Sequence, residues 1–151
     1  MGASHRRALR GVAVAATWGV ALLTCACSGI FGLDNSKSGL SCVDDSKECV
    51  DQRQATLQTY LADKDRKWVK EPATAQAHAS GVRLFAFRSR KKELSCDELA
   101  HARREADGAP KALRGPEGKS LSPAQISRAT MFAAEVSKEL AAEMRAKRCR
   151  A

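Results

Sequence analysis

The sequence predicts a small all-α domain of three or four helices, braced by two disulfides and preceded by a cleaved signal peptide and a flexible tether. Three observations favour this fold class. Apolar residues recur at helical spacing in several segments, two capping boxes mark helix starts, and an even number of cysteines follows the signal. Aromatic residues make up only 5% of the chain, so we expect a thin core for which covalent bracing matters.

The first helix is expected over residues 46–65. Its apolar residues recur at intervals of seven, four and seven, which places them on one helical face: Val50, Leu57, Leu61 and Trp68. Tyr60 widens this face. Pro72 disfavours helix in the residue before it and closes the segment.

The next segment, residues 74–92, is compatible with two structures. Thr74 is suited to cap a helix, whereas the run 82–87 also resembles a short strand. No second convincing strand exists to pair with it, and a lone strand would leave its backbone groups without partners. We therefore favour a helix over 74–92.

Two capping boxes predict the remaining helices. Ser95 with Glu98 starts a helix expected to end near Ala106, before a loop over 109–121 that contains glycine and proline. Ser122 with Gln125 starts the clearest helix, over 123–148. Its apolar stripe is Ile126, Ala129, Ala133, Val136, Leu140 and Met144.

The N-terminus has the pattern of an export signal. Residues 1–10 are basic and contain no acid, and residues 11–23 form an apolar stretch of 13 residues. A bilayer-spanning helix needs about 20 apolar residues, so this stretch is too short to span a membrane but suits a signal peptide. The signal is expected to cover residues 1–26.

The sequence Leu23-Thr24-Cys25-Ala26-Cys27 resembles the lipobox of bacterial lipoproteins, with Ala26 in the small position before the cysteine. The resemblance implies cleavage before Cys27, transfer of diacylglycerol to its thiol and N-acylation. Cys25 is the alternative lipid site, although Thr24 suits the preceding position less well. Ser28 follows in place of the aspartate that retains family members in the inner membrane, which implies the outer membrane, facing the periplasm.

The resemblance divides the chain into a signal peptide (1–26), a lipidated flexible tether (27–41) and a helical domain (42–151). The tether is rich in glycine and serine. The Ala/Arg-rich composition and the cysteine spacing are also similar to those of short, uncharacterised lipoproteins of alphaproteobacteria, a resemblance that implies no activity.

Four cysteines remain after Cys27, and an exported protein is expected to oxidise them to two disulfides. Three pairings are possible. We favour Cys42–Cys49, which is local, and Cys96–Cys149, because an antiparallel helix hairpin would bring the start of one helix to the end of the next.

Charge offers one candidate binding surface. Loss of Arg6, Arg7 and Arg10 with the signal lowers the net charge from +9 to +6. The densest basic run contains Arg88, Arg90, Lys91 and Lys92 and is a candidate site for anionic envelope lipid or glycan, although a solvated helix end is favoured. Nucleic acid is not an expected partner of an exported protein.

No catalytic constellation was found, so the sequence favours a non-enzymatic interaction module anchored to the membrane. His78 and His101 lack the partners and spacing of a metal site, and no cofactor is expected beyond the covalent lipid. Two alternatives stay open: a binder of anionic envelope lipid or glycan, and a small periplasmic hydrolase or hydrolase inhibitor.

Overall fold

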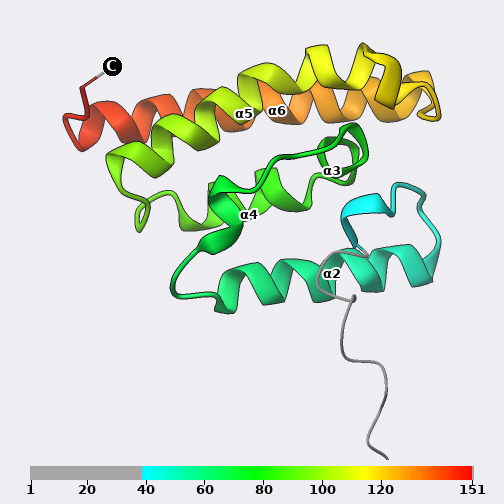
Figure 1. The fold of residues 1–151 in the computed structure, drawn as a ribbon, viewed down its shortest axis with the longest axis horizontal. Coiled ribbons are helices and arrows are strands. Elements are labelled where there is room, and N and C mark those ends of the chain that lie inside the picture. The colour runs from blue at the N-terminus through cyan, green and yellow to red at the C-terminus, as the bar shows by residue number, and fades with distance from the viewer. Residues whose placement is uncertain (1–38, 151) are drawn as a thin grey trace, which may run out of the picture.

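The computed structural model describes residues 39–150 and is all-helical, with no strand in that range (Figure 1). The predicted all-α class is therefore confirmed. The signal peptide, both lipidation candidates and most of the tether lie outside the described residues. None of the helices in 39–150 combines the length and the apolar character needed to cross a membrane.

The helices form three layers. Helix α2 (Lys47–Ala62) forms one outer layer, and the antiparallel hairpin of α5 (Cys96–Arg114) and α6 (Pro123–Ala146) forms the other. Between them lie two shorter helices, α3 (Ala75–Ser80) and α4 (Val82–Arg90). Residues 39–41 are also helical, and there are two single turns of 3₁₀ helix: η1 (Lys67–Lys70) and η2 (Pro116–Gly118).

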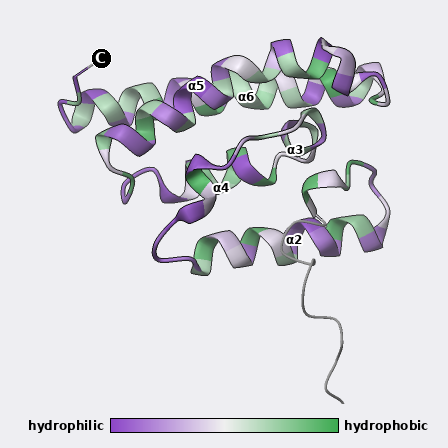
Figure 2. Ribbon diagram, viewed as in Figure 1, coloured by the Kyte–Doolittle hydropathy of each residue, from purple (hydrophilic) through white to green (hydrophobic). Residues whose placement is uncertain are grey.

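The two predicted capping boxes are both present. Ser95 accepts the Glu98 amide while Glu98 accepts the Ser95 amide, and Ser122 and Gln125 are joined in the same way. Helix α6 buries the predicted stripe from Ala129 to Met144 against α5 and the middle layer. Hydrophobic and hydrophilic residues accordingly alternate along α5 and α6 (Figure 2).

Both favoured cysteine pairs are disulfide-bonded. Cys42 bonds Cys49, and Cys96 bonds Cys149, with Cα atoms 5.4 Å apart in each pair. The first closes the loop before α2. The second ties the start of α5 to the end of α6, as the antiparallel hairpin requires.

The prediction of one continuous helix over 74–92 is wrong, because the segment forms two helices. Gly81 has φ 73°, a left-handed conformation that ends α3 and sets the direction of α4. Thr74 caps α3 as expected, since its side chain accepts the Ala77 amide at 3.1 Å. The segment is helical on both sides of the break, so the strand alternative is also wrong.

The predicted end near Ala106 and the loop over 109–121 are wrong as well. Helix α5 continues through Gly108 and Pro110 to Arg114. A proline inside a helix costs about 3 kcal/mol, because it removes a hydrogen bond and crowds the preceding turn. Burial of Ala109 and Leu113, which extend the stripe of Leu99, Ala102 and Ala106, offsets that cost.

The first helix is shorter and rotated relative to the prediction. It ends at Ala62 rather than at 65, and Trp68 belongs to η1. Its buried face carries Cys49, Thr56 and Tyr60, whereas Val50 is exposed. Residues 39–41, predicted as part of the tether, are helical and packed: Gly39 N donates to Thr56 Oγ1 at 3.2 Å and Leu40 packs against the core.

The core contains an aromatic stack and a buried ion pair. Tyr60 stacks on Trp68 with ring centroids 4.7 Å apart, and Phe87 lies 5.0 Å from Trp68. Arg83 lies beside the Trp68 and Phe87 rings and forms two hydrogen bonds to Glu105, at 2.8 and 2.6 Å. Its other contacts are the carbonyls of Trp68 and Glu71.

Substitutions of two glycines, one within α5 and one just after it, are expected to change the stability of the domain in opposite directions. A Cβ on Gly118 would lie 2.0 Å from the Leu113 carbonyl oxygen, so Gly118→Ala must shift the backbone and should destabilise the domain by about 1–3 kcal/mol. A Cβ on Gly108 meets nothing within 4 Å, so Gly108→Ala should stabilise the helix by up to about 1 kcal/mol. Urea unfolding followed by Trp68 fluorescence measures both; equal effects of the two substitutions would contradict the packing argument.

Candidate functional site

An apolar cleft lies between α2, the α3–α4 junction and α6. Its volume is about 420 Å³, and it is bordered on one side by the loop that precedes α2. Apolar side chains from four segments line it: Val43, Val50, Leu57, Val82, Phe85 and Phe132. Clefts with mostly apolar walls and few polar groups are typical of binding sites.

The positions of Val50 and Phe85 distinguish this cleft from ordinary surface. Val50 is 42% exposed and Phe85 is 45% exposed, and both line it. The third large apolar side chain exposed within residues 39–150 is Met131, which is 71% exposed and lies outside the cleft. Exposed apolar side chains gathered in one concave surface indicate a contact site more strongly than the same residues scattered singly.

Polar contacts hold the loop before α2 against the rest of the domain. Arg53 donates to the carbonyls of Cys42 and Asp44 at 3.3 and 2.6 Å, and Gln125 of α6 donates to the Val43 carbonyl at 2.9 Å. The Cys42–Cys49 disulfide closes the same loop. This wall of the cleft is therefore fixed by contacts with both α2 and α6.

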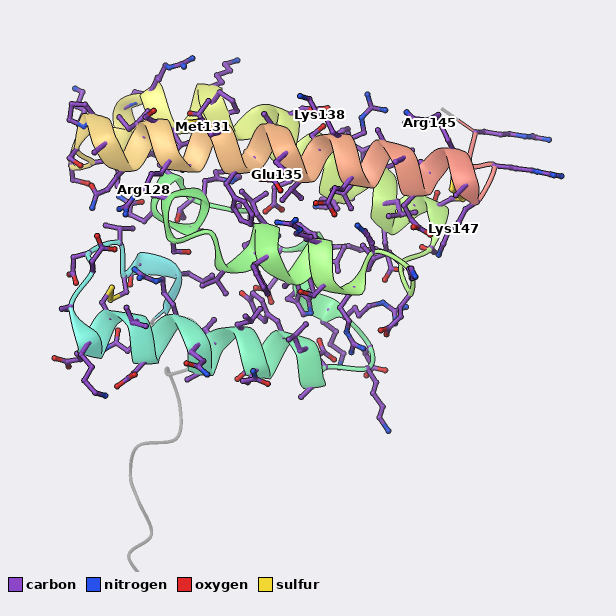
Figure 3. The ribbon with its side chains drawn as sticks, turned by 180° about the vertical axis from the view of Figure 1, so that it is seen from behind. Arg128, Met131, Glu135, Lys138, Arg145 and Lys147 are labelled. Atoms are coloured by element: carbon purple, nitrogen blue, oxygen red, sulfur yellow. A yellow bond between two sulfur atoms is a disulfide. The ribbon has the colours of Figure 1, made fainter. Side chains whose placement is uncertain are left out.

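Three charged residues line the cleft: Asp45, Arg53 and Arg128. Asp45 lies 3.3 Å from Arg128 and 4.0 Å from Arg53. Figure 3 places Arg128 between α6 and the segment that leads into α2. Two guanidinium groups therefore meet at the Asp45 carboxylate, and the Asp44 carboxylate also interacts with Arg53.

A second, smaller pocket lies beside α5 and contains both histidines of the domain. It is lined by His78, His101, Arg104, Glu71 and Glu105. His78 is buried, and its Nδ1 has no hydrogen-bond partner in the described structure. Burial lowers the pKa of His78; nearby Glu105 opposes this shift and Arg83 reinforces it.

This environment predicts a pH dependence of stability. The unfolded His78 has a pKa near 6.5 and binds a proton more readily than the folded one, so stability should be complete above about pH 6.5 and fall as the pH drops below it. His78→Gln should flatten this part of the profile, and His101→Gln in the same pocket is the matched control. Urea midpoints between pH 5 and 8 measure it, and an unchanged slope in His78→Gln would refute it.

The predicted anionic site is largely neutralised by the domain's own carboxylates. Arg88 pairs with Glu135 and Glu139 at 3.1 and 2.9 Å, and Lys91 also pairs with Glu139. The hydrogen bond from Lys91 lowers the pKa of Glu139. Arg90 pairs with Glu93 and donates to the Leu61 carbonyl, so the run forms a connection between α4 and its neighbours more than a free cationic surface.

The thiols of the described domain are engaged with one another. Cys42, Cys49 and the Asp44 carboxylate lie close enough for a metal site, but the two sulfurs are bonded to each other. Cys96 is bonded to Cys149, which keeps its thiol from acting with His101. Thiolate nucleophiles and thiolate ligands are therefore not available among residues 39–150.

Sequence reasoning missed both the cleft and the buried Arg83–Glu105 pair. The pair had one local signal, since Arg83 interrupts the otherwise apolar run 82–87. The cleft had none, because its walls come from segments more than 80 residues apart. No family model matches the chain, and comparison with curated proteins and with solved structures finds no match.

Proposed function

We propose that this chain is a non-enzymatic cell-envelope lipoprotein: a helical interaction module tethered by a lipid on Cys27 to the outer membrane, facing the periplasm. The observation that carries the proposal is the pairing of the cysteines. All four cysteines of the helical domain are paired with one another, so two remain for acylation, Cys25 and Cys27. Both lie in the lipobox-like sequence 23–27, which spans the expected cleavage site.

The disulfides support an oxidising compartment, since cytosolic proteins keep their thiols reduced. Durable anchoring in turn needs more than one acyl chain, at about 0.8 kcal/mol for each buried CH₂ group. Acylation at both the thiol and the amino group of Cys27 meets that requirement. Ser28 supports the outer membrane, because it replaces the aspartate that favours inner-membrane retention.

The decisive experiment labels growing cells with radioactive palmitate. The wild-type chain and Cys25→Ala should both be labelled and recovered in the membrane fraction. Cys27→Ala should carry no label and should accumulate as an unprocessed precursor. Label and normal processing in Cys27→Ala would overturn the assignment, and loss of label in Cys25→Ala alone would move the lipid to Cys25.

The apolar cleft supports binding rather than catalysis as the role of the module. Its charged groups, Arg53, Arg128 and Asp45, pair with one another rather than converging on a reacting atom. A partner purified with the lipoprotein from membranes should be lost from Phe85→Ser and retained by Met131→Ser. Equal recovery with both variants would refute a binding role for the cleft.

A further inference from the structure

The chain enters the domain beside one wall of the apolar cleft. Gly39 packs closely on α2, where a Cβ on Gly39 would lie 2.7 Å from the Arg53 Cα. Its amide donates to Thr56 Oγ1 at 3.2 Å. Arg53 also lines the cleft, so the first described residue of the chain and the cleft share the same turns of α2.

The tether is long enough to reach the cleft. The six residue-to-residue steps from Leu33 to Gly39 span up to about 20 Å when extended. A helix with its side chains is about 10–12 Å across, so this length is sufficient to pass around α2. Residues 30–34 are therefore within reach of the cleft.

The composition of the tether matches the cleft. Between Cys27 and Gly39 the large apolar residues are Ile30, Phe31 and Leu33, and the acidic residue Asp34 follows directly. The cleft offers the exposed faces of Val50 and Phe85. Beside them, the Arg128 side chain is 62% exposed and pairs with Asp45, which leaves its guanidinium accessible to a second carboxylate.

We propose that residues 30–34 of the tether dock in this cleft of the same chain, with the apolar side chains against Phe85 and Asp34 beside Arg53 and Arg128. The inference rests on the proposed function only for the start of the mature chain at Cys27. Docking shortens the distance between the lipid anchor and the domain. It also covers the apolar surface, so a partner must displace the tether before it can occupy the cleft.

In-cell photo-crosslinking of the full chain tests the proposal. A benzophenone amino acid replaces Phe31, cells are irradiated, and the crosslinked residues are mapped by mass spectrometry. We expect a crosslink within one chain to residues of the cleft, such as Val50, Leu57 or Phe132. Crosslinks only to lipid, to another protein or to a second copy of the chain would overturn the proposal.

Variants of the same protein separate the apolar contribution to docking from the ionic contribution. Phe85→Ser should abolish the intrachain crosslink, whereas Met131→Ser, which removes an exposed apolar side chain elsewhere, should leave it intact. Asp34→Lys should reduce it about twofold to fivefold, the range expected for an exposed ion pair. Equal crosslinking in Phe85→Ser and the wild type would also overturn the proposal.

Two further measurements distinguish a loss of docking from a loss of folding or of acylation. Retained disulfides and an unchanged melting temperature establish that Phe85→Ser is folded, as expected for a half-exposed side chain. Palmitate labelling of the same cells reports acylation separately. A labelled chain without the intrachain crosslink would refute docking alone, whereas a crosslinked chain without label would refute the lipid anchor alone.

Discussion

Replacing Glu105 by alanine is expected to lower the free energy of unfolding by about 3–5 kcal/mol, because it leaves the buried Arg83 charge without its partner. The side chains of Arg83 and Glu105 are only 2% and 7% exposed, so water cannot take the place of the lost carboxylate. The carbonyls of Trp68 and Glu71 would still accept hydrogen bonds from Arg83 but would not neutralise it. A domain of this size has a total stability of about 5–15 kcal/mol, so this loss is a large fraction of the total.

Glu135→Ala is the matched control for Glu105→Ala. It also removes a carboxylate from an arginine pair, but Glu135 is exposed and Arg88 is partly exposed, and such surface pairs contribute about 0–1 kcal/mol. Urea unfolding followed by the fluorescence of Trp68, which packs beside Arg83, measures both variants. Equal destabilisation by the two substitutions would show that the buried pair has no special role.

The double variant Arg83→Met/Glu105→Leu separates charge burial from packing. Replacing both partners of a buried pair by apolar residues of similar volume is often neutral or stabilising. We therefore expect the double variant to be more stable than Glu105→Ala. A double variant that is less stable would indicate that the shape of the pair, rather than its charge balance, holds the core together.

Removing the Cys96–Cys149 disulfide with a double serine substitution is expected to cost about 4 kcal/mol in the chain-entropy model. The bond joins residues 53 positions apart and ties the start of α5 to the end of α6. Without it, the unfolded chain gains the freedom of a long loop. The ends of the hairpin would then be held only by noncovalent contacts.

The double serine variant of Cys42 and Cys49 provides the comparison. Its cysteines are seven positions apart, and the same model predicts a loss of about 2.5 kcal/mol. Serine at both positions avoids a lone thiol that could form other disulfides. Urea midpoints of the two double variants test the order, and a larger loss for Cys42/Cys49 than for Cys96/Cys149 would contradict the loop-length argument.

Features determined by short stretches of sequence were predicted correctly. The capping boxes at Ser95 and Ser122 need only residues within one helical turn, and both form. The apolar stripe of α6 is long and regular enough to specify its own buried face. The favoured cysteine pairs followed from the even number of cysteines and from the hairpin that helices over 95–106 and 123–148 imply.

Features that depend on distant surfaces were not predictable in this way. Gly108 and Pro110 are local signals for the end of a helix, yet α5 continues because α6 and η2 provide a surface on which Ala109 and Leu113 are buried. Val50 fits an apolar stripe, yet it faces a cleft instead of the core. The sequence by itself thus determined the helical class, the starts of α5 and α6 and the disulfides, since these depend on neighbouring residues and cysteine number. Only the tertiary structure decided where α5 ends, which charges are buried and where the cleft lies, because burial is set by surfaces that segments far apart in the chain contribute.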